Sequence, residues 1–110
     1  MKRIILEMGM GTDLYGEDYT KAACRAIDDA IRHSSLILFR SLDLPHEMMK
    51  VNVTVGVQQP DAVDKAQVAA KLPRGKAEVC VVHGGQNVID DDNGATSVIA
   101  SVAVEAYYPF

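Results

Sequence analysis

The sequence predicts an α/β (α+β) fold, a single β-α-β-α-β-β domain with a four-stranded mixed sheet and two helices on one face. The chain has 110 residues, which is the size of one domain with one core. Two segments show helical spacing, and four show the apolar runs or alternation of strands. Their order gives two right-handed crossovers followed by a hairpin, so we treat residues 1–110 as one domain.

The first strand is predicted over Arg3–Met8, an apolar run interrupted only by Glu7. Alternation places Ile4, Leu6 and Met8 on one face of this strand and Ile5 and Glu7 on the other. We expect a loop over 9–17, because each of its three glycines would destabilise a helix by about 1 kcal/mol.

The first helix is predicted over Tyr19–His33, with Asp18 as its N-cap. Its apolar stripe is rich in alanine, which suggests that the helix sits close to a sheet; the stripe contains Ala23, Ala26, Ile27, Ala30 and Ile31. Leu36–Pro45 is ambiguous, because it fits either a short strand or an apolar extension of the helix.

Met48–Gln58 alternates valine with polar residues and is the clearest strand pattern in the chain. Pro60 in a first turn opens a second helix, Asp61 to about Lys71, which ends before Pro73. These segments supply the second strand and the second helix of the predicted order.

The last two strands are predicted over Ala77–His83 and Thr96–Tyr107. Gly84-Gly85 is typical of a bend, after which Val88-Ile89 could continue the third strand. Asn93-Gly94 in the following acidic turn favours a tight hairpin.

Helices on one side leave the other face of the sheet uncovered. The residues expected there mix charged, polar and apolar side chains: Ile5, Glu7, Lys50, Asn52, Thr54, Ile99, Ser101, Ala103, Glu105 and Tyr107. Apolar side chains are poor choices for a fully solvated surface, so we expect this face to lie in an oligomer interface.

Composition narrows the classes of function. The formal net charge is −4, which argues against a nucleic-acid partner. No apolar run approaches the roughly 20 residues that a bilayer needs, so no membrane partner is expected. Cys24 and Cys80 lack metal-site spacing and are interpreted as two buried thiols in a reducing cytoplasm.

The 9–21 stretch is a candidate ligand site between a strand end and a helix start. Backbone N–H groups at a helix start attract anions, and Lys21 could add a positive charge. The acidic side chains of the stretch would repel a phosphate, and its glycine spacing matches no phosphate-binding motif. A hard-cation site would use Glu7 and Asp13. The alternative is that Asp18 caps the helix and Asp13 closes a turn. The candidate ligand-binding residues are Gly9, Gly11, Thr12, Asp13, Asp18, Lys21, Gly84 and Gly85.

Glu7 is the least explained residue, because a carboxylate inside an apolar strand must be paired, at an interface or functional. Lys50 begins the strand expected beside it and could form an ion pair. His83 lies next to flexible glycines that could approach a ligand closely. Glu7, Lys50 and His83 are therefore the candidate acid–base residues, and the sequence identifies no cofactor.

Residues 7–36, EMGMGTDLYGEDYTKAACRAIDDAIRHSSL, closely resemble the opening of a family of hypothetical proteins named after a Listeria "lin" locus. The resemblance continues through VNVTVGVQQPDAVD, LPRGKAEVCVVHGGQ and SVIASVAVEA. It implies a fold similar to the C-terminal domain of tubulin and FtsZ, a layout shared with trimeric Bacillus-type chorismate mutase and enamine-deaminase trimers. It implies no catalytic residues.

Two functions are consistent with these observations. One is a homo-oligomer, a trimer or a multiple of it, with small-molecule sites between subunits and acid–base chemistry such as hydrolysis or isomerisation on a small polar substrate. The other is a non-catalytic structural or regulatory assembly module.

Overall fold

The computed structural model describes residues 1–32, 37–73 and 75–110. Within them a five-stranded sheet has the order β1 (Lys2–Asp13), β5 (Thr96–Tyr108), β2 (Lys50–Val57) and β3 (Lys76–His83). β4 (Gln86–Ile89) pairs with β5 beyond the end of β2. Only β2 and β3 are parallel, so the sheet is mixed, as the sequence predicts.

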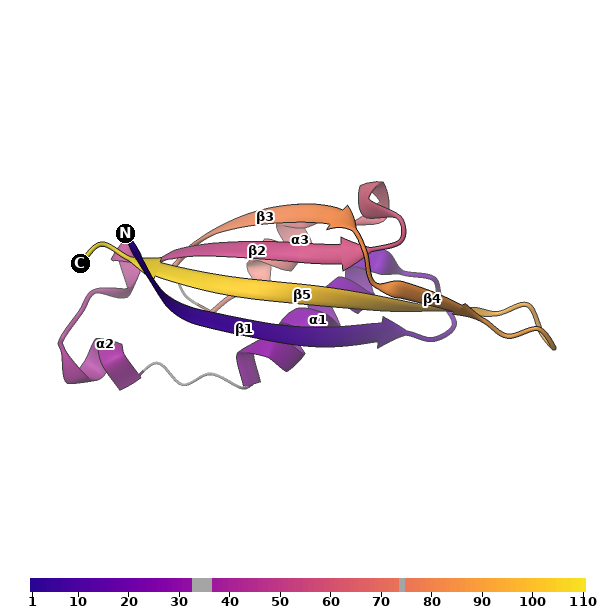
Figure 1. Cartoon of the computed structure of the whole chain (residues 1–110), viewed down its shortest axis with the longest axis horizontal. Helices are drawn as coiled ribbons and strands as arrows, with labels where there is room; N and C mark the ends of the chain where they lie inside the picture. The colour runs from indigo at the N-terminus through magenta and orange to yellow at the C-terminus, as the bar shows by residue number, and fades with distance from the viewer. Residues whose placement is uncertain (33–36, 74) are drawn as a thin grey trace.

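The longer helices lie on one side of the sheet, as predicted (Figure 1). α1 (Tyr19–Arg32) packs on β1 and β5, and α3 (Lys65–Ala70) packs on β3. The helix-facing core is built from alternating valines of β2 and β5 and from the small residues of α1, namely Ala22, Ala23, Ala26 and Ala30, together with Tyr19 and Ile27. The alanine stripe therefore marks a close helix–sheet contact, as expected.

β1 runs five residues further than the predicted strand, through Gly9 and Gly11 to Asp13. The expectation of a loop from Gly9 was wrong, because these glycines serve packing rather than a turn. A Cβ built on Gly9 would lie 2.5 Å from the Ala26 carbonyl oxygen and 2.6 Å from the Ala30 nitrogen. The missing side chains let the backbone of α1 rest directly on the strand.

The predicted second helix is divided into a 3₁₀ turn, η2 (Pro60–Ala62), and α3. Asp64 starts α3, because its carboxylate accepts hydrogen bonds from the backbone N–H groups of Ala66 (3.0 Å) and Gln67 (3.3 Å). The Thr20 hydroxyl accepts the Asp64 N–H (2.8 Å), which ties this cap to α1.

The ambiguous segment after α1 contains a short helix, α2 (Ile37–Ser41), and a 3₁₀ turn, η1 (His46–Met48). Phe39 is buried and stacks edge-on against Tyr108, with ring centroids 5.5 Å apart. It therefore belongs to the core, while His33 and Leu36 lie outside the described residues.

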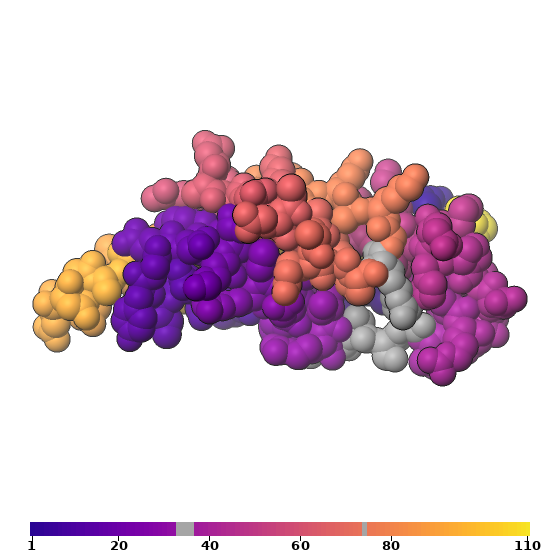
Figure 2. Space-filling model, turned by 180° about the vertical axis from the view of Figure 1, so that it is seen from behind, coloured from indigo at the N-terminus to yellow at the C-terminus, as the bar shows by residue number. Residues whose placement is uncertain are grey.

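Val88-Ile89 does not continue β3 but forms the separate strand β4, which makes a hairpin with β5. The turn is closed by the Asp90 N–H donating to the Ala95 carbonyl (2.8 Å), and Gly94 has the left-handed φ of 72° that such a turn requires. This hairpin, residues 86–99 and here called the arm, projects from one end of the molecule (Figures 1 and 2).

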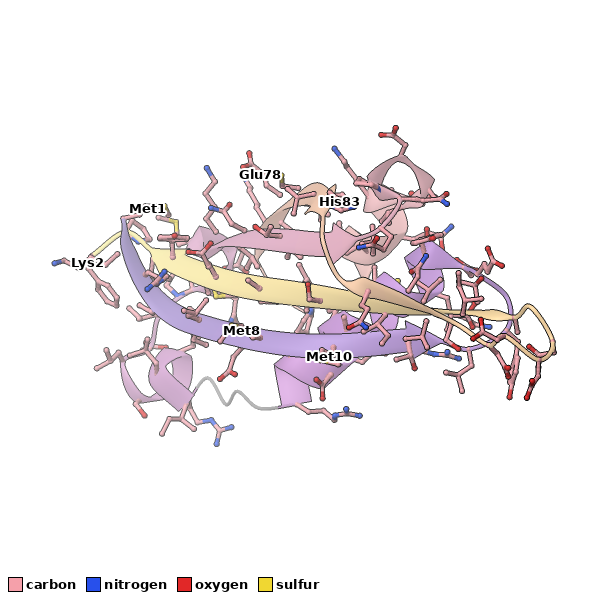
Figure 3. The ribbon with its side chains drawn as sticks, turned by 45° about the vertical axis from the view of Figure 1, so that its right-hand side comes forward. Met1, Lys2, Met8, Met10, Glu78 and His83 are labelled. Atoms are coloured by element: carbon pink, nitrogen blue, oxygen red, sulfur yellow. The ribbon has the colours of Figure 1, made fainter. Side chains whose placement is uncertain are left out.

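The uncovered face of the sheet, here called the open face, differs from the prediction on β1. Glu7 pairs with Val104 and lies on the helix-covered side with Gly9 and Gly11, while Met8 and Met10 lie on the open face (Figure 3). Ile5 likewise pairs with Ala106 on the covered side. The open face includes Leu6, Met8, Met10, Lys50, Asn52, Thr54, Glu78, Cys80, Val82, Ile99, Ser101, Ala103, Glu105 and Tyr107.

Candidate functional site

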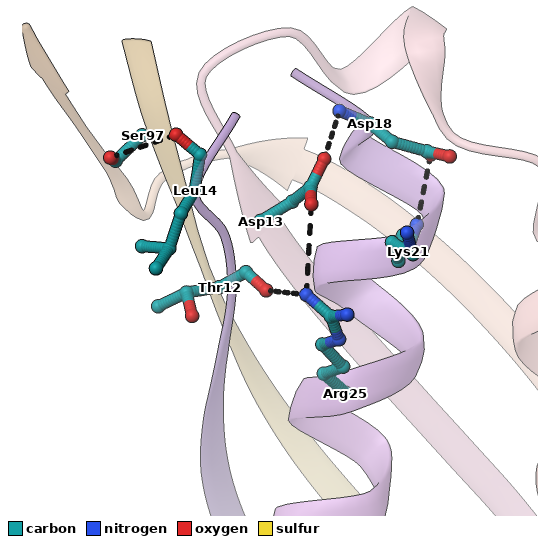
Figure 4. A network of polar contacts seen from close by, with 7 residues as sticks. All are labelled: Thr12, Asp13, Leu14, Asp18, Lys21, Arg25 and Ser97. Carbon is teal, nitrogen blue, oxygen red and sulfur yellow. Dashed lines mark hydrogen bonds and ion pairs between the residues drawn. The ribbon is translucent and has the colours of Figure 1, made fainter. Parts of the chain in front are cut away.

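The loop from β1 to α1 is held by the buried carboxylate of Asp13 (Figure 4). Asp13 Oδ2 accepts a hydrogen bond from the Asp18 N–H (2.9 Å), and Oδ1 lies 3.6 Å from Arg25 Nη1. The same guanidinium nitrogen donates to the Thr12 carbonyl oxygen (2.6 Å). Asp13 thus closes the loop and is neutralised within the chain.

Asp18 is the N-cap of α1, as predicted. Its Oδ1 accepts the Lys21 N–H (3.0 Å), and its carbonyl accepts the Ala22 N–H (3.0 Å). Carboxylates of Asp13 and Asp18 therefore already occupy the anion-attracting end of the helix. This arrangement supports the capping interpretation rather than phosphate binding.

The acids of β1 do not converge on a cation. Glu7 and Asp13 are six residues apart in one strand, which separates their Cα atoms by about 20 Å. No group of three His, Cys, Asp or Glu residues with the geometry of a metal site occurs in the described part of the chain. The cation interpretation gains no support.

The three predicted acid–base residues are also dispersed. Glu7 is separated from Lys50 by the intervening strand β5 and lies on the other face of the sheet, so the expected ion pair is absent. Lys50 opens β2, whereas His83 pairs with Val57 at the far end, about 23 Å away along the strand. Of the three, His83 lines a recess on the described surface.

Gly84 and Gly85 carry the chain from β3 across the end of β2 to β4. The Gly84 N–H donates to the Val57 carbonyl (2.9 Å), and its own carbonyl accepts from Gln58 Nε2 (3.0 Å). Gly85 has φ 61°, and a Cβ there would meet the Gly56 carbonyl oxygen at 2.8 Å. The crossing needs both glycines for close approach, and it forms one wall of a recess.

That recess is a hollow of about 630 Å³ on the open face, within the size range of small-molecule sites. Small residues of β2 and β5 form its floor: Thr54, Gly56, Ser101 and Ala103. Met8 and Met10 line one side, and Val82, His83 and Gly84 line the other. His83 and Asp29 contribute its ionisable groups among the described residues.

A charged cluster lies on the same face, away from the hollow. The Tyr107 hydroxyl donates to Glu105 Oε2 (2.8 Å), and Arg3 Nη1 pairs with the same oxygen (3.1 Å). The Tyr107 hydrogen bond, followed by that of Arg3, lowers the pKa of Glu105, and it raises the pKa of Tyr107. These groups stabilise one another and are not poised for proton transfer near neutral pH.

The cysteines are not a buried pair. Cys24 is half-buried and Cys80 is exposed on the open face. Burial raises the pKa of the Cys24 thiol, which keeps it protonated and unreactive.

Sequence reasoning missed the hollow because it assigned Met8 to the core side of β1. The alternation of methionine with glycine at positions 8–11 indicates which face of β1 meets the helix. Glycines opposite an alanine-rich helix indicate the contact face, which leaves the methionines on the other side.

Fold and site together define a small α/β domain with one covered and one bare sheet face, and with an open hollow rather than an enclosed catalytic centre. The family model described as "Conserved hypothetical protein (Lin0512_fam)" matches residues 3–106, and the chain belongs to this family. The predicted resemblance is therefore confirmed.

A solved structure agrees with this assignment. The crystal structure of an FtsZ-like protein of unknown function (Npun_r1471) from Nostoc punctiforme PCC 73102 is 32% identical, with a TM-score of 0.82. The match covers 98% of this chain and 97% of that one. No curated protein matches the chain. None of the described helices has the length and apolar character to cross a membrane.

Proposed function

We propose that the chain functions as a homo-oligomer whose copies bury the open face of the sheet, and that the hollow becomes a small-molecule site closed by a neighbouring copy. The observation that carries this proposal is the exposure of Met8 (68%) and Met10 (60%) beside a floor of small neutral residues. Large apolar side chains flanking a recess mark contact surfaces. The resemblance described above favours a trimer or a multiple of it.

The lining of the hollow supports a small polar ligand. Thr54 and Ser101 supply hydroxyl groups, and Asp29 is already engaged by the Met10 N–H (3.0 Å) and by Arg32 (3.0 Å). His83 is then the group available for acid–base chemistry on the ligand, and histidine is a residue type suited to such chemistry. Glu7 and Lys50 have no part in this proposal because they lie elsewhere.

The interface is tested by measuring oligomer mass with light scattering. We expect Met8→Lys to lower the mass of the wild-type oligomer, because a charge on the buried face must be desolvated. Tyr15→Lys is the matched control, since Tyr15 is also strongly exposed (82%) but lies in the loop between β1 and α1, off the sheet. An unchanged mass for Met8→Lys contradicts the proposed interface.

The ligand site is tested by screening small polar fragments with ligand-observed NMR. We expect the wild-type protein to bind some of these fragments. Ser101→Leu should lose them, because the leucine side chain fills the floor of the hollow, whereas Asp61→Lys, a control at an exposed site, should still bind them. Fragments bound equally by both variants would place the site elsewhere.

The second candidate is a non-catalytic assembly module. The internal satisfaction of Asp13 and Asp18 favours it, because these acids are then used for structure. An oligomer that Met8→Lys disrupts, but in which no fragment reaches the hollow, would support this candidate.

A further inference from the structure

The two ends of the molecule differ in charge. It is elongated, with extents of 55 × 23 × 18 Å, and the arm stands at one end while residues 1 and 110 lie at the other (Figure 1). Figure 2 shows the arm clear of the helices on the back of the sheet. The arm and the opposite end are therefore the parts most distant from each other.

The tip of the arm is acidic, and none of its carboxylates takes part in an ion pair within the described residues. Asp90, Asp91 and Asp92 are exposed, and the only described hydrogen bond to their side chains is the Asp92 N–H donating to Asp90 Oδ1 (2.9 Å). Behind the tip, Val88 and Ile89 are 47% and 64% exposed. A two-stranded hairpin with bare apolar side chains is marginally stable alone, so the arm has the character of a contact element.

The opposite end, here called the basic end, carries lysines on three strands. The register pairs Lys50 with Lys76 directly, and it places Lys2 and Lys50 opposite Tyr108 and Tyr107 of β5. Within the described part of the chain none of these lysines has an ion pair, whereas Arg3 is neutralised by Glu105. Like charges side by side repel, so an anionic group bound between Lys50 and Lys76 would reduce their mutual repulsion.

The basic end also carries acids and apolar groups. Asp43 and Glu47 lie on the connection between α2 and β2, and Glu78 and Glu105 flank Asn52 on the neighbouring strands. The five cations Lys2, Arg3, Arg40, Lys50 and Lys76 outnumber these four carboxylates by one. Met1, Met48 and Phe110 are each more than half exposed there. The basic end thus combines positive charge with apolar surface, and the arm combines negative charge with apolar surface.

We propose that the arm of one copy binds the basic end of a second copy, so that copies join head to tail. The chain supplies both complementary surfaces, while two arms or two basic ends would repel each other. Such a contact uses different patches on the two partners, and it continues until the copies close a ring or extend as a filament. It goes beyond the open-face interface proposed above, because Met8 and Met10 have no part in it.

The test uses sedimentation velocity over a protein concentration series at about 50 mM and about 500 mM NaCl, since salt screens exposed charges. We expect wild-type protein to form larger species at low salt that dissociate at high salt. Asp91→Lys/Asp92→Lys and Lys50→Glu/Lys76→Glu should each weaken this association by at least roughly tenfold. An equimolar mixture of the two variants should restore it, because each arm then meets a complementary end.

Three further measurements make the result decisive. Asp61→Lys, an exposed change on η2, should behave as wild type. Met8→Lys should retain the salt-dependent association even if the open-face oligomer is lost. If the charge-reversal variants fail to fold, the neutral double variant Asp91→Asn/Asp92→Asn replaces them, and it should also weaken the association. Salt-independent masses, charge-reversal variants that associate as wild type, or a mixture of the two that restores nothing would each overturn the proposal and leave another protein as the partner of the arm.

Discussion

Replacing Gly9 by alanine tests the contact that sets the distance between α1 and the sheet. The added Cβ would lie 2.5 Å from the Ala26 carbonyl oxygen and 2.6 Å from the Ala30 nitrogen, where ordinary contacts are 3.4–4 Å. Both partners are backbone atoms of one helix, so neither can rotate away. The helix must move off the strand by about 1 Å, and its buried alanines lose contact with it.

Two opposing effects set the magnitude. Overpacking of this kind costs about 2–3 kcal/mol. Alanine also restricts the unfolded chain more than glycine does, which raises the free energy of unfolding by about 0.4–1 kcal/mol. We therefore expect Gly9→Ala to lower the free energy of unfolding by about 2 kcal/mol, because the steric term is larger.

Urea unfolding of the variant and the wild type, followed by circular dichroism, measures this difference. Gly94→Ala is the control, because a Cβ there meets no atom within 4 Å and only the φ of 72° opposes it. Gly94→Ala should lower the free energy of unfolding by about 1 kcal/mol. If Gly9→Ala were as stable as Gly94→Ala, the direct helix–strand contact would be refuted.

Three further predictions concern single carboxylates. Asp13→Ala leaves the Asp18 N–H without its acceptor and should cost about 2 kcal/mol in urea unfolding; a neutral effect would show that the loop does not depend on it. Asp64→Ala removes the α3 cap and should cost about 1 kcal/mol by the same assay, with Asp61→Ala as the control expected to cost nothing. Glu105 has a lowered pKa in the folded state, so its stabilising effect is present above its unfolded pKa and is lost as pH falls through the folded value. The stability gap between wild type and Glu105→Gln should therefore shrink below about pH 4, and a gap independent of pH would contradict the cause assigned to the shift.

The order of strands and helices could be predicted because each pattern is local. The valines of β2 alternate, and Gly94 supplies the left-handed φ in the four-residue loop, 91–94, that closes the hairpin. The cap at Asp18 also depends on residues within one turn. These elements needed no knowledge of distant contacts.

The limits of β1 and the division of the second helix depend on tertiary contacts, which local patterns do not contain. Gly9 and Gly11 interrupt an apolar run in the sequence, but in the fold they accommodate α1. Asp64 caps α3 while its N–H is held by Thr20, a residue of another helix. The predicted position of Glu7 failed for the same reason, because strand order decides its neighbours.

The candidate site was predicted only in part. Gly84, Gly85 and His83 border the hollow or its wall, as their position beside a bend suggested. Lys21, Thr12 and the acids of the loop turned out to serve the start of α1, because Asp13 and Asp18 use their oxygens within the chain. Met8 and Ser101 come together only across two strands, which no spacing in the sequence reveals.

The central position of β5 has a consequence for the kinetics of folding. Among the described residues β1 joins the sheet through β5, in a pairing that runs from Lys2 with Tyr108 to Asp13 with Val98. The β2–β3 pair, by contrast, closes a much shorter loop and can form early. Bringing together strands roughly a hundred residues apart is slow, so we expect β1 and α1 to consolidate late and in a single rate-limiting step.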